Sequence, residues 1–313
     1  PDYVIWDYKM RLAEQLARSN PDTSEFIYNE TLDRANARLE TKLSQEAVKA
    51  WKELKALAIA DLGLVYKTRA EYDKALEFYN ESRSIRQSLG NKRGEAQVLL
   101  NISSLYGDQG DTDSKKEYVL AARDLFHEIQ DSLGMSQAEN FLGFYFYQVG
   151  EIDSALNAFY RASDILKGTT NEESRADLLN NIAFIHNMRG EDELALGIYD
   201  ESYSVRESID DKYGMAESLN NIGYIYKHRG NFQLALEYYF KGLEIYEEIK
   251  EMGGIASMSN NIGMVAVSQK DYNLALEYFD RAFIAYDSLN NVARLSVVSS
   301  NIGFAYLASV DTL

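Results

Sequence analysis

The sequence contains no cysteine and very little proline or histidine. Its 313 residues include two prolines and three histidines. The absence of cysteine excludes disulfides and thiolate metal sites, and it leaves the cellular compartment open. Both prolines, Pro1 and Pro21, lie near the start, so the strongest helix breaker is missing from the rest of the chain.

Basic residues are also in deficit. The chain has 32 Lys and Arg against 49 Asp and Glu, a net charge of −17, and no basic block. Nucleic acid and acidic membrane surfaces would be repelled, so neither is expected as a partner. No apolar run reaches the roughly 18–20 residues that span a bilayer, so no membrane insertion is expected. The chain begins with Pro and shows no signal peptide, which favours a piece processed or excised from something longer.

An apolar residue followed by a small one recurs at a fixed spacing of 40 positions. The apolar members are Leu62, Ile102, Leu142, Ile182, Ile222, Ile262 and Ile302, and the small members are Gly63, Ser103, Gly143, Ala183, Gly223, Gly263 and Gly303. Seven registrations at one spacing indicate identical units that stack and share a core.

One unit reads as two helices. Residues 214–229 are predicted to form the first helix, because Leu219, Ile222 and Tyr226 recur on one face. Gly230 breaks this helix, and Asn231 can cap a second one over 232–249. Short connections make the two helices antiparallel neighbours.

Small residues also recur on the second helix. Ala75, Ala155, Ala195, Ala235 and Ala275 share one column, and Tyr79, Phe159, Tyr199, Tyr239 and Phe279 share the aromatic column four residues later. Small side chains let the helices approach closely, and the rings fill the flanks. A few positions depart from the pattern: Lys115 replaces the alanine, Ala70 and Lys270 replace the turn glycine, and His186 and Ala266 replace an aromatic residue.

These columns resemble the tetratricopeptide repeat over about residues 50–313. The pair Ile222-Gly223, then Tyr226, Gly230 and Ala235, match its signature. The resemblance implies an all-α, right-handed solenoid of antiparallel helix pairs. The usual unit has 34 residues; units of 40 look like those of kinesin light chains and cell-polarity adaptors. The sequence of the repeat most resembles bacterial repeats that lie N-terminal to histidine kinases, nucleotide cyclases or DNA-binding regulators.

The predicted organisation has three parts. Residues 1–50 are expected to form degenerate repeat-like helices, residues 51–294 six 40-residue units, and residues 295–313 the first helix of a truncated seventh unit. A long helix is predicted from about 42 to 68. The connector 167–171 differs from the other inter-repeat turns, and a tolerated loop variant is favoured there over a hinge.

The first helices of such an array line its concave side. On the helix over 214–229, a stripe of polar and aromatic residues lies opposite the core, and equivalent positions recur in other units. The candidate peptide-binding residues are Asn101, Asn140, Phe144, Asn181, Phe184, Glu217, Asn220, Asn221, Tyr224, Lys227, His228, Asn261, Met264 and Asn301.

Paired asparagines are unfavourable inside helices and need an explanation. In the tetratricopeptide family, an Asn at the position matching Asn101, Asn181, Asn221, Asn261 and Asn301 commonly binds the backbone of an extended peptide. The alternative is that these amides bond to the neighbouring repeat and set its stacking. If the peptide role holds, replacing Asn181, Asn221 and Asn261 by Ala should abolish partner binding with little change in stability.

Nothing in the sequence indicates catalysis. His127, His186 and His228 have no second ligand at zinc spacing, and no glycine-rich phosphate loop follows a strand. No metal or cofactor is expected, and an enzyme is not expected.

Three functions remain open. The first is a protein- or peptide-binding scaffold, as the sensory or regulatory region of a bacterial signalling protein. The second is a free-standing adaptor that links two proteins. The third is a dimerisation or autoinhibitory module, with a homodimer as one form of it. The last helix, with Ile302, Tyr306 and Leu307 unpartnered, favours further chain beyond it.

Overall fold

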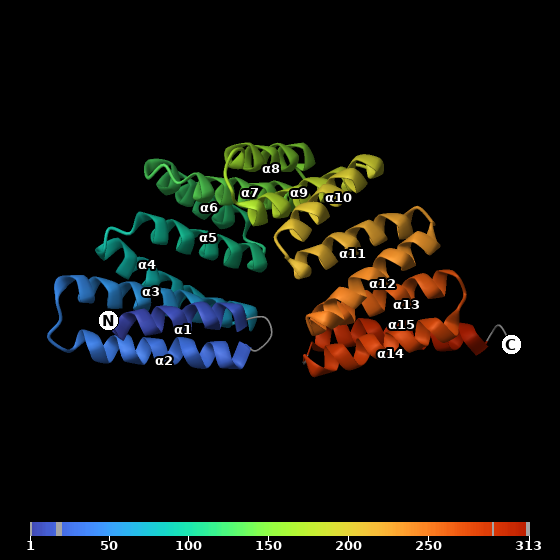
Figure 1. The fold of residues 1–313 in the computed structure, drawn as a ribbon, viewed down its shortest axis with the longest axis horizontal. Coiled ribbons are helices and arrows are strands. Elements are labelled where there is room, and N and C mark those ends of the chain that lie inside the picture. The colour runs from blue at the N-terminus through green and yellow to red at the C-terminus, as the bar shows by residue number, and fades with distance from the viewer. Residues whose placement is uncertain (1, 17–20, 290, 311–313) are drawn as a thin grey trace. The chain divides into compact units, whose positions relative to one another are not determined.

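The computed structural model describes residues 2–16, 21–289 and 291–310, and all regular secondary structure in those residues is helical (Figure 1). The chain divides into two compact units, Pro1–Lys167 and Gly168–Leu313. The helices of the first unit, hereafter unit 1, are α1 (Asp2–Leu16), α2 (Pro21–Leu39), α3 (Gln45–Thr68), α4 (Tyr72–Ser88), α5 (Lys92–Gln109), α6 (Thr112–Glu128), α7 (Ser132–Gln148) and α8 (Ile152–Leu166). Those of the second, unit 2, are α9 (Glu172–Met188), α10 (Asp192–Ser208), α11 (Lys212–His228), α12 (Phe232–Glu248), α13 (Met252–Ser268), α14 (Tyr272–Ser288) and α15 (Val292–Val310).

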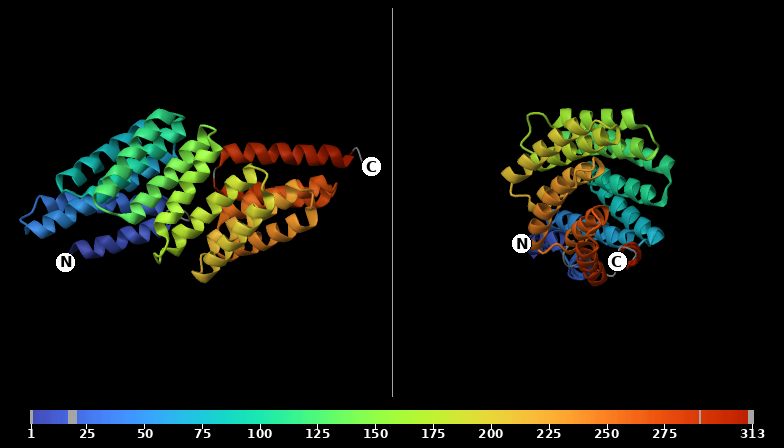
Figure 2. Two further views of the ribbon diagram at one scale, coloured as in Figure 1. Left: turned by 90° about the horizontal axis from the view of Figure 1, so that it is seen from above. Right: turned by 90° about the vertical axis from the view of Figure 1, so that its right-hand side faces the viewer.

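Within each unit the helices pack in chain order as antiparallel pairs (Figure 1 and Figure 2). Each second helix also packs on the next first helix, and successive first helices touch: α3, α5 and α7 in unit 1, and α9, α11, α13 and α15 in unit 2. The predicted all-α solenoid of helix pairs is therefore confirmed. The helices predicted over 214–229 and 232–249 are α11 and α12, with ends within two residues of the prediction.

The turn inside each pair has one backbone shape. Gly110, Gly150, Gly190 and Gly230 have φ between 73° and 82°, the left-handed conformation that glycine adopts without strain. Ala70 and Lys270, which replace this glycine, adopt the same conformation with φ of 60° and 62°. The repeat therefore imposes its turn even on residues that disfavour it.

The paired helices meet at the columns read from the sequence. The aromatic residues Tyr79, Phe159, Tyr239 and Phe279 are buried, each against a small residue of the preceding helix. A Cβ added at the facing glycine would lie 2.4–2.8 Å from the ring, at Gly63, Gly143, Gly223 and Gly263. Glycine is therefore required there because the ring occupies the space of a side chain.

The N-terminal helices share the core of unit 1. Trp6 and Met10 of α1 and Tyr28 of α2 pack with Trp51 of α3. α3 begins at Gln45, not near 42, because the Ser44 side chain accepts a hydrogen bond from the Ala47 amide and caps the helix. The three-part division proposed from the sequence remains a prediction.

The connector 167–171 coincides with the boundary between the two units. α8 ends at Leu166, Gly168 has φ of 81°, and the Asn171 side chain caps α9 through the Ser174 amide. A change of compact unit at this connector agrees with its unusual sequence.

None of the helices in the described ranges has the length and apolarity required to cross a bilayer. On α15, Tyr306 and Leu307 are more than half exposed, as the sequence predicted, and Ile302 is half-buried.

Candidate functional site

A ladder of asparagine amides joins the first helices of unit 2. Asn221 on α11 donates a hydrogen bond from Nδ2 to Asn180 Oδ1 on α9, at 3.2 Å. The same bond recurs one repeat later from Asn261 to Asn220, at 2.8 Å, and again from Asn301 to Asn260, at 3.0 Å. We call these six residues, Asn180, Asn220, Asn221, Asn260, Asn261 and Asn301, the amide ladder.

The ladder explains why adjacent asparagines occupy helix interiors. All six side chains are half-buried, and each bond links two asparagines that lie 41 residues apart in the sequence, on successive first helices. The stacking role that the sequence left open is thus present in unit 2. The expectation that alanine at Asn221 and Asn261 would leave stability nearly unchanged remains a prediction, in which the gain in helix propensity offsets most of the lost bond.

Ladder bonding does not exhaust the amides. A carboxamide carries two N–H donors and an oxygen with two lone pairs, and each ladder bond uses one donor and one lone pair. Since the side chains keep partial solvent exposure, the remaining groups can bond to a backbone laid along the ladder. Stacking and peptide binding are therefore compatible roles for the same residues.

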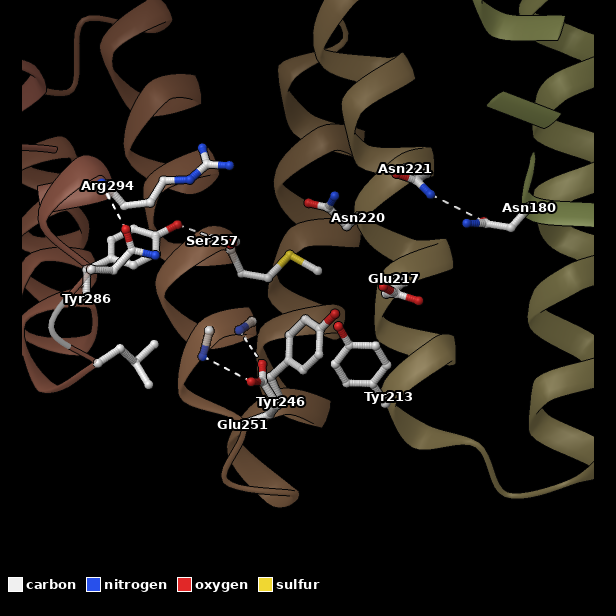
Figure 3. Close-up of a pocket in the computed structure, with 15 residues that line it drawn as sticks. Asn180, Tyr213, Glu217, Asn220, Asn221, Tyr246, Glu251, Ser257, Tyr286 and Arg294 are labelled. Atoms are coloured by element: carbon white, nitrogen blue, oxygen red, sulfur yellow. Dashed lines mark hydrogen bonds between the residues drawn. The ribbon is translucent and has the colours of Figure 1, made fainter. Parts of the chain in front are cut away.

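An open pocket of about 380 Å³ lies beside the ladder in unit 2 (Figure 3). We call it the ladder pocket. It is formed by α11 and α13, the start of α15, the ends of α12 and α14, and Asn180 of α9. Its lining residues are Asn180, Tyr213, Glu217, Asn220, Asn221, Tyr246, Glu251, Gly253, Gly254, Ser257, Met258, Tyr286, Leu289, Asn291 and Arg294.

The lining mixes phenol rings with polar groups of both charges. Ser257 Oγ lies 3.1 Å from Tyr286 OH, and the Arg294 side chain is exposed (Figure 3). Glu251 caps α13, where its carboxylate accepts hydrogen bonds from the amides of Gly253 and Gly254. Burial, followed by the charge of Glu217, raises the pKa of Tyr246, so this phenol stays a neutral donor.

A buried arginine supports the edge of the ladder pocket. Arg206 on α10 lies 2.8 Å from Asp177 and 2.6 Å from Asp211, and 4.0 Å from Glu217. Its side chain is only 4% exposed, so these carboxylates are needed to stabilise its buried positive charge. The network fixes α10 against the N-terminal ends of α9 and α11.

The other predicted residues of α11 form a separate cluster. The rings of Tyr224 and His228 lie 4.2 Å apart, and Lys227 Nζ lies 5.5 Å from the Tyr224 ring. Burial lowers the pKa of Lys227. Tyr224 is 44% exposed, so it offers an aromatic surface on the helix that carries the ladder.

The remaining predicted residues are distributed over both units. Asn181 and Phe184 are half-buried on α9, and Met264 is exposed on α13. Asn101, Asn140 and Phe144 belong to unit 1, where the Phe144 ring meets Phe159 edge-on at 5.3 Å. The structure thus brings Glu217, Asn220 and Asn221 to one pocket and connects Asn220, Asn221, Asn261 and Asn301 through the ladder.

Sequence reasoning missed the second-helix side of the ladder pocket. Tyr246 and Tyr286 end α12 and α14, and they share a 40-residue column with Arg206. That column is a detectable signal. Glu251 stands in the column of helix-capping residues that holds Asn91, Asp131, Asn171, Asp211 and Asn291. Arg294 replaces the glycine found at 94, 134, 214 and 254, and this departure from the column was a second signal.

No group of three or more His, Asp or Glu side chains in the described residues is arranged to hold a metal ion. His186 is buried and lies 2.5 Å from Glu191, a local contact at the end of α9. The three histidines thus occupy three different settings, since His127 is on α6 and the His228 ring is tilted against the Tyr224 ring.

Family models for the tetratricopeptide repeat match residues 174–248 and residues 256–283. The chain carries tetratricopeptide repeats in these two segments. The matched segments lie within α9 to α14, the helices that hold most of the amide ladder and the ladder pocket. No curated protein matches the chain.

Solved structures share the fold at low sequence identity. Aspartyl phosphate phosphatase F from Bacillus subtilis is 15% identical, with a TM-score of 0.61 over 96% of this chain and 84% of that one. A Rap protein complexed with Competence and Sporulation Factor is 11% identical, with a TM-score of 0.61 over 99% and 100% of the two chains. NprR in complex with its cognate peptide NprX is 15% identical, with a TM-score of 0.57 over 96% and 82%. At these identities the likeness concerns the fold.

Proposed function

We propose that this chain is a non-enzymatic, peptide-binding repeat scaffold that serves as the sensory or regulatory region of a bacterial signalling protein. An extended peptide lies along the amide ladder, with side chains in the ladder pocket and on Tyr224. Binding fixes the spacing of the first helices, and a downstream element reads that change.

The observation that carries the proposal is the combination of the amide ladder and the ladder pocket. The ladder presents half-buried amides at a regular spacing, which suits a peptide backbone. The adjoining pocket supplies aromatic surface and charged groups, which suit its side chains. Polar groups that set register beside apolar area that gives affinity are what peptide recognition requires.

The comparisons support the same class of ligand. Two of the solved structures that share the fold are complexes, one with Competence and Sporulation Factor and one with the cognate peptide NprX. Both come from proteins that the chain matches over nearly its whole length. The residues that would bind a peptide here are argued from this chain alone.

Selection from a displayed library of linear peptides tests the proposal. We expect enriched peptides whose affinity falls about tenfold or more in Arg294→Ala and Tyr224→Ala. Both side chains are exposed, so the variants should keep wild-type stability. Glu244→Ala, on the exposed face of α12, is the matched control and should bind normally.

Two outcomes would contradict the proposal. One is that no peptide is enriched over the library background. The other is that enriched peptides bind both variants as tightly as the control. Light scattering on the same samples separates the alternatives: a dimer whose dissociation accompanies binding would favour the dimerisation module, and simultaneous capture of two unlike peptides would favour an adaptor.

A further inference from the structure

A buried lysine in unit 1 departs from the repeat pattern. Lys115 on α6 occupies the column in which the other complete repeats carry alanine, and it is 8% exposed. Lysine is rarely buried to this extent unless its charge is paired. Burial lowers the pKa of the Lys115 ammonium, so this position costs stability compared with the alanine of its neighbours.

A second departure in the same repeat makes room for this side chain. Residue 107, on the facing helix α5, is glycine, whereas the same column holds Lys67, Tyr147, Asn187, Lys227 and Val267 in other repeats. A Cβ at Gly107 would lie 3.2 Å from Lys115 Cδ and 3.4 Å from Nζ. The lysine stem therefore passes over Gly107. The glycine compensates for the lysine in the same repeat, which indicates that the buried lysine has a role. Departures from the sequence pattern of a fold concentrate at functional sites.

The ammonium group ends in an open pocket of about 360 Å³ that lies within unit 1. We call it the lysine pocket, and its lining residues are Ser104, Gly107, Asp108, Lys115, Phe141, Phe144 and Gln148. Lys115 Nζ donates a hydrogen bond to Gln148 Oε1 at 2.8 Å. An ammonium group carries three donors, so two remain for a ligand.

The charges of the lysine pocket do not cancel. Its carboxylate, Asp108, lies 2.9 Å from Lys67 Nζ, which also donates to Ser104 Oγ at 2.9 Å. In the described part of the chain Lys115 forms no ion pair, and its contact is with a neutral amide. The pocket therefore keeps one positive charge in a chain of net charge −17.

Aromatic surface adjoins this charge. Phe144 is 40% exposed and Phe141 is half-buried, both on α7. Phe141 stands in the column that carries asparagine at 101, 181, 221, 261 and 301, so the repeat here exchanges an amide for a ring. A desolvated ammonium beside two rings suits an anionic group that is joined to an apolar one.

We propose that the lysine pocket binds a carboxylate of a peptide ligand, with a neighbouring apolar side chain of the ligand on Phe141 and Phe144. In taking the carboxylate to belong to a peptide, this inference rests on the proposed function. The site itself is independent of the amide ladder, which lies in unit 2.

Small acidic probes test the site on the whole chain by NMR of 15N-labelled lysine ammonium groups. N-acetyl-phenylalanyl-glutamate α-amide offers a side-chain carboxylate, and N-acetyl-phenylalanyl-glutamine free acid offers a terminal one. N-acetyl-phenylalanyl-glutamine amide offers neither, and acetate offers a carboxylate without a ring. We expect one or both acidic dipeptides to shift the Lys115 resonance and raise its pKa towards the ordinary value, and to bind more tightly than acetate.

Substitutions at neighbouring lysines assign the effect. Lys115→Met keeps the length of the side chain and should weaken the acidic dipeptides about tenfold or more. Lys115→Ala installs the residue of the other repeats, so it should fold and show the same loss. Lys116→Met removes the same charge from the exposed face of α6 and should change affinity less than about twofold.

Several results would overturn the proposal. The neutral dipeptide could bind as tightly as the acidic ones, or Lys115→Met could bind all probes like the wild-type protein. Failure of every acidic probe to shift Lys115 at concentrations of about 10 mM would do the same. Acetate binding as tightly as the dipeptides would leave an anion site without the apolar subsite, against the proposal.

The two proposals can fail separately. If Arg294→Ala and Tyr224→Ala leave selected peptides unaffected while the acidic dipeptides still bind at Lys115, the proposed function fails and the lysine pocket stands. If selected peptides depend on unit 2 but show no preference for acidic residues and ignore Lys115→Met, only the lysine pocket fails.

Discussion

At the scale of single residues, comparison of the repeats identifies residues that are destabilising at their position. Asp61 on α3 is one. It stands in the column that holds asparagine at 101, 181, 221, 261 and 301, and its Oδ2 is buried with no hydrogen-bond partner in the described residues. Burial first, then repulsion by Glu14, raises the pKa of Asp61 to about 7, although Arg86 acts in the opposite direction.

We predict that Asp61 makes the chain less stable at pH 8 than at pH 5. Its pKa is higher in the folded than in the unfolded state, so the folded state binds the extra proton and stability falls as pH rises from about 4 to about 7. Asp61→Asn should raise the free energy of unfolding at pH 8 by about 2–4 kcal/mol and much less at pH 5. Denaturant titrations at both values measure this, and an unchanged pH dependence in the variant would contradict it.

Tyr239 gives a second prediction at this scale. Its hydroxyl is buried and has no hydrogen-bond partner among the described residues, while Phe279 fills the same column without a hydroxyl. Tyr239→Phe should leave stability unchanged or raise it by about 1 kcal/mol, because an unsatisfied polar group is removed. Tyr239→Ala, by contrast, should cost about 3–5 kcal/mol through the cavity it leaves. A thermal melt in which the phenylalanine variant loses stability would show that the hydroxyl is satisfied.

Lys270 tests the turn between the paired helices. It holds φ of 62° where four other repeats have glycine. Lys270→Gly should stabilise the chain by about 0.5–1 kcal/mol, because relief of the left-handed strain exceeds the added entropy of the unfolded chain. The reverse change, Gly230→Ala, should destabilise it by a similar amount. Equal melting temperatures for Lys270→Gly and the wild-type protein would argue against strain at this turn.

At the scale of helices, the amide ladder determines how first helices of unit 2 pair. Each asparagine loses about 0.6 kcal/mol of helix propensity relative to alanine, and each ladder bond returns about 1 kcal/mol. The net change in unfolding free energy for a single Asn→Ala substitution is therefore small, and it underestimates the energy of the ladder bond. The coupling between the two partners measures it directly.

We therefore predict a coupling energy of about 0.5–1.5 kcal/mol between Asn180→Ala and Asn221→Ala in a double-mutant cycle of unfolding free energies. The two side chains share a bond of 3.2 Å. Asn180→Ala with Asn261→Ala is the control pair, since Asn261 bonds to Asn220 instead, and it should be additive. Additivity in both cycles would mean that the ladder does not contribute to stacking.

The fold of each helix pair was largely predictable at this scale. The columns that contain Gly223 and Tyr239 predicted a contact between the two residues, and the structure places the glycine against the ring. The ladder bonds were not predictable, because a donor and acceptor 41 residues apart meet only if the helices stack with a particular offset. Sequence reasoning could name Asn221 and Asn261 but could not choose their partners.

At the scale of the whole molecule, the net charge affects stability. An excess of 17 negative charges repels itself, and monovalent salt screens such repulsion over about 10 Å at 0.1 M. We predict that the melting temperature rises between low salt and about 0.15 M sodium chloride. Potassium chloride should act equally if screening is the cause. A fall with salt would mean that the surface ion pairs contribute more than the net repulsion costs.

The candidate binding surfaces also separate at this scale. The ladder and its pocket belong to unit 2, and the lysine pocket belongs to unit 1. The sequence placed its candidate residues in one stripe from Asn101 to Asn301, because the period is uninterrupted. The division at the connector 167–171 assigns the two pockets to different units, and each pocket is tested by its own variants.

The sequence by itself determined the helix pairs, their turns and the columns of residues that pack between them. The reason is that every repeat uses the same local pattern, and the two helices of a pair are consecutive in the sequence. Tertiary structure alone decided which amides bond to one another, where the Lys115 stem emerges and which tyrosines line the ladder pocket. Those outcomes depend on distances between side chains of different repeats, and spacing along the chain does not fix them.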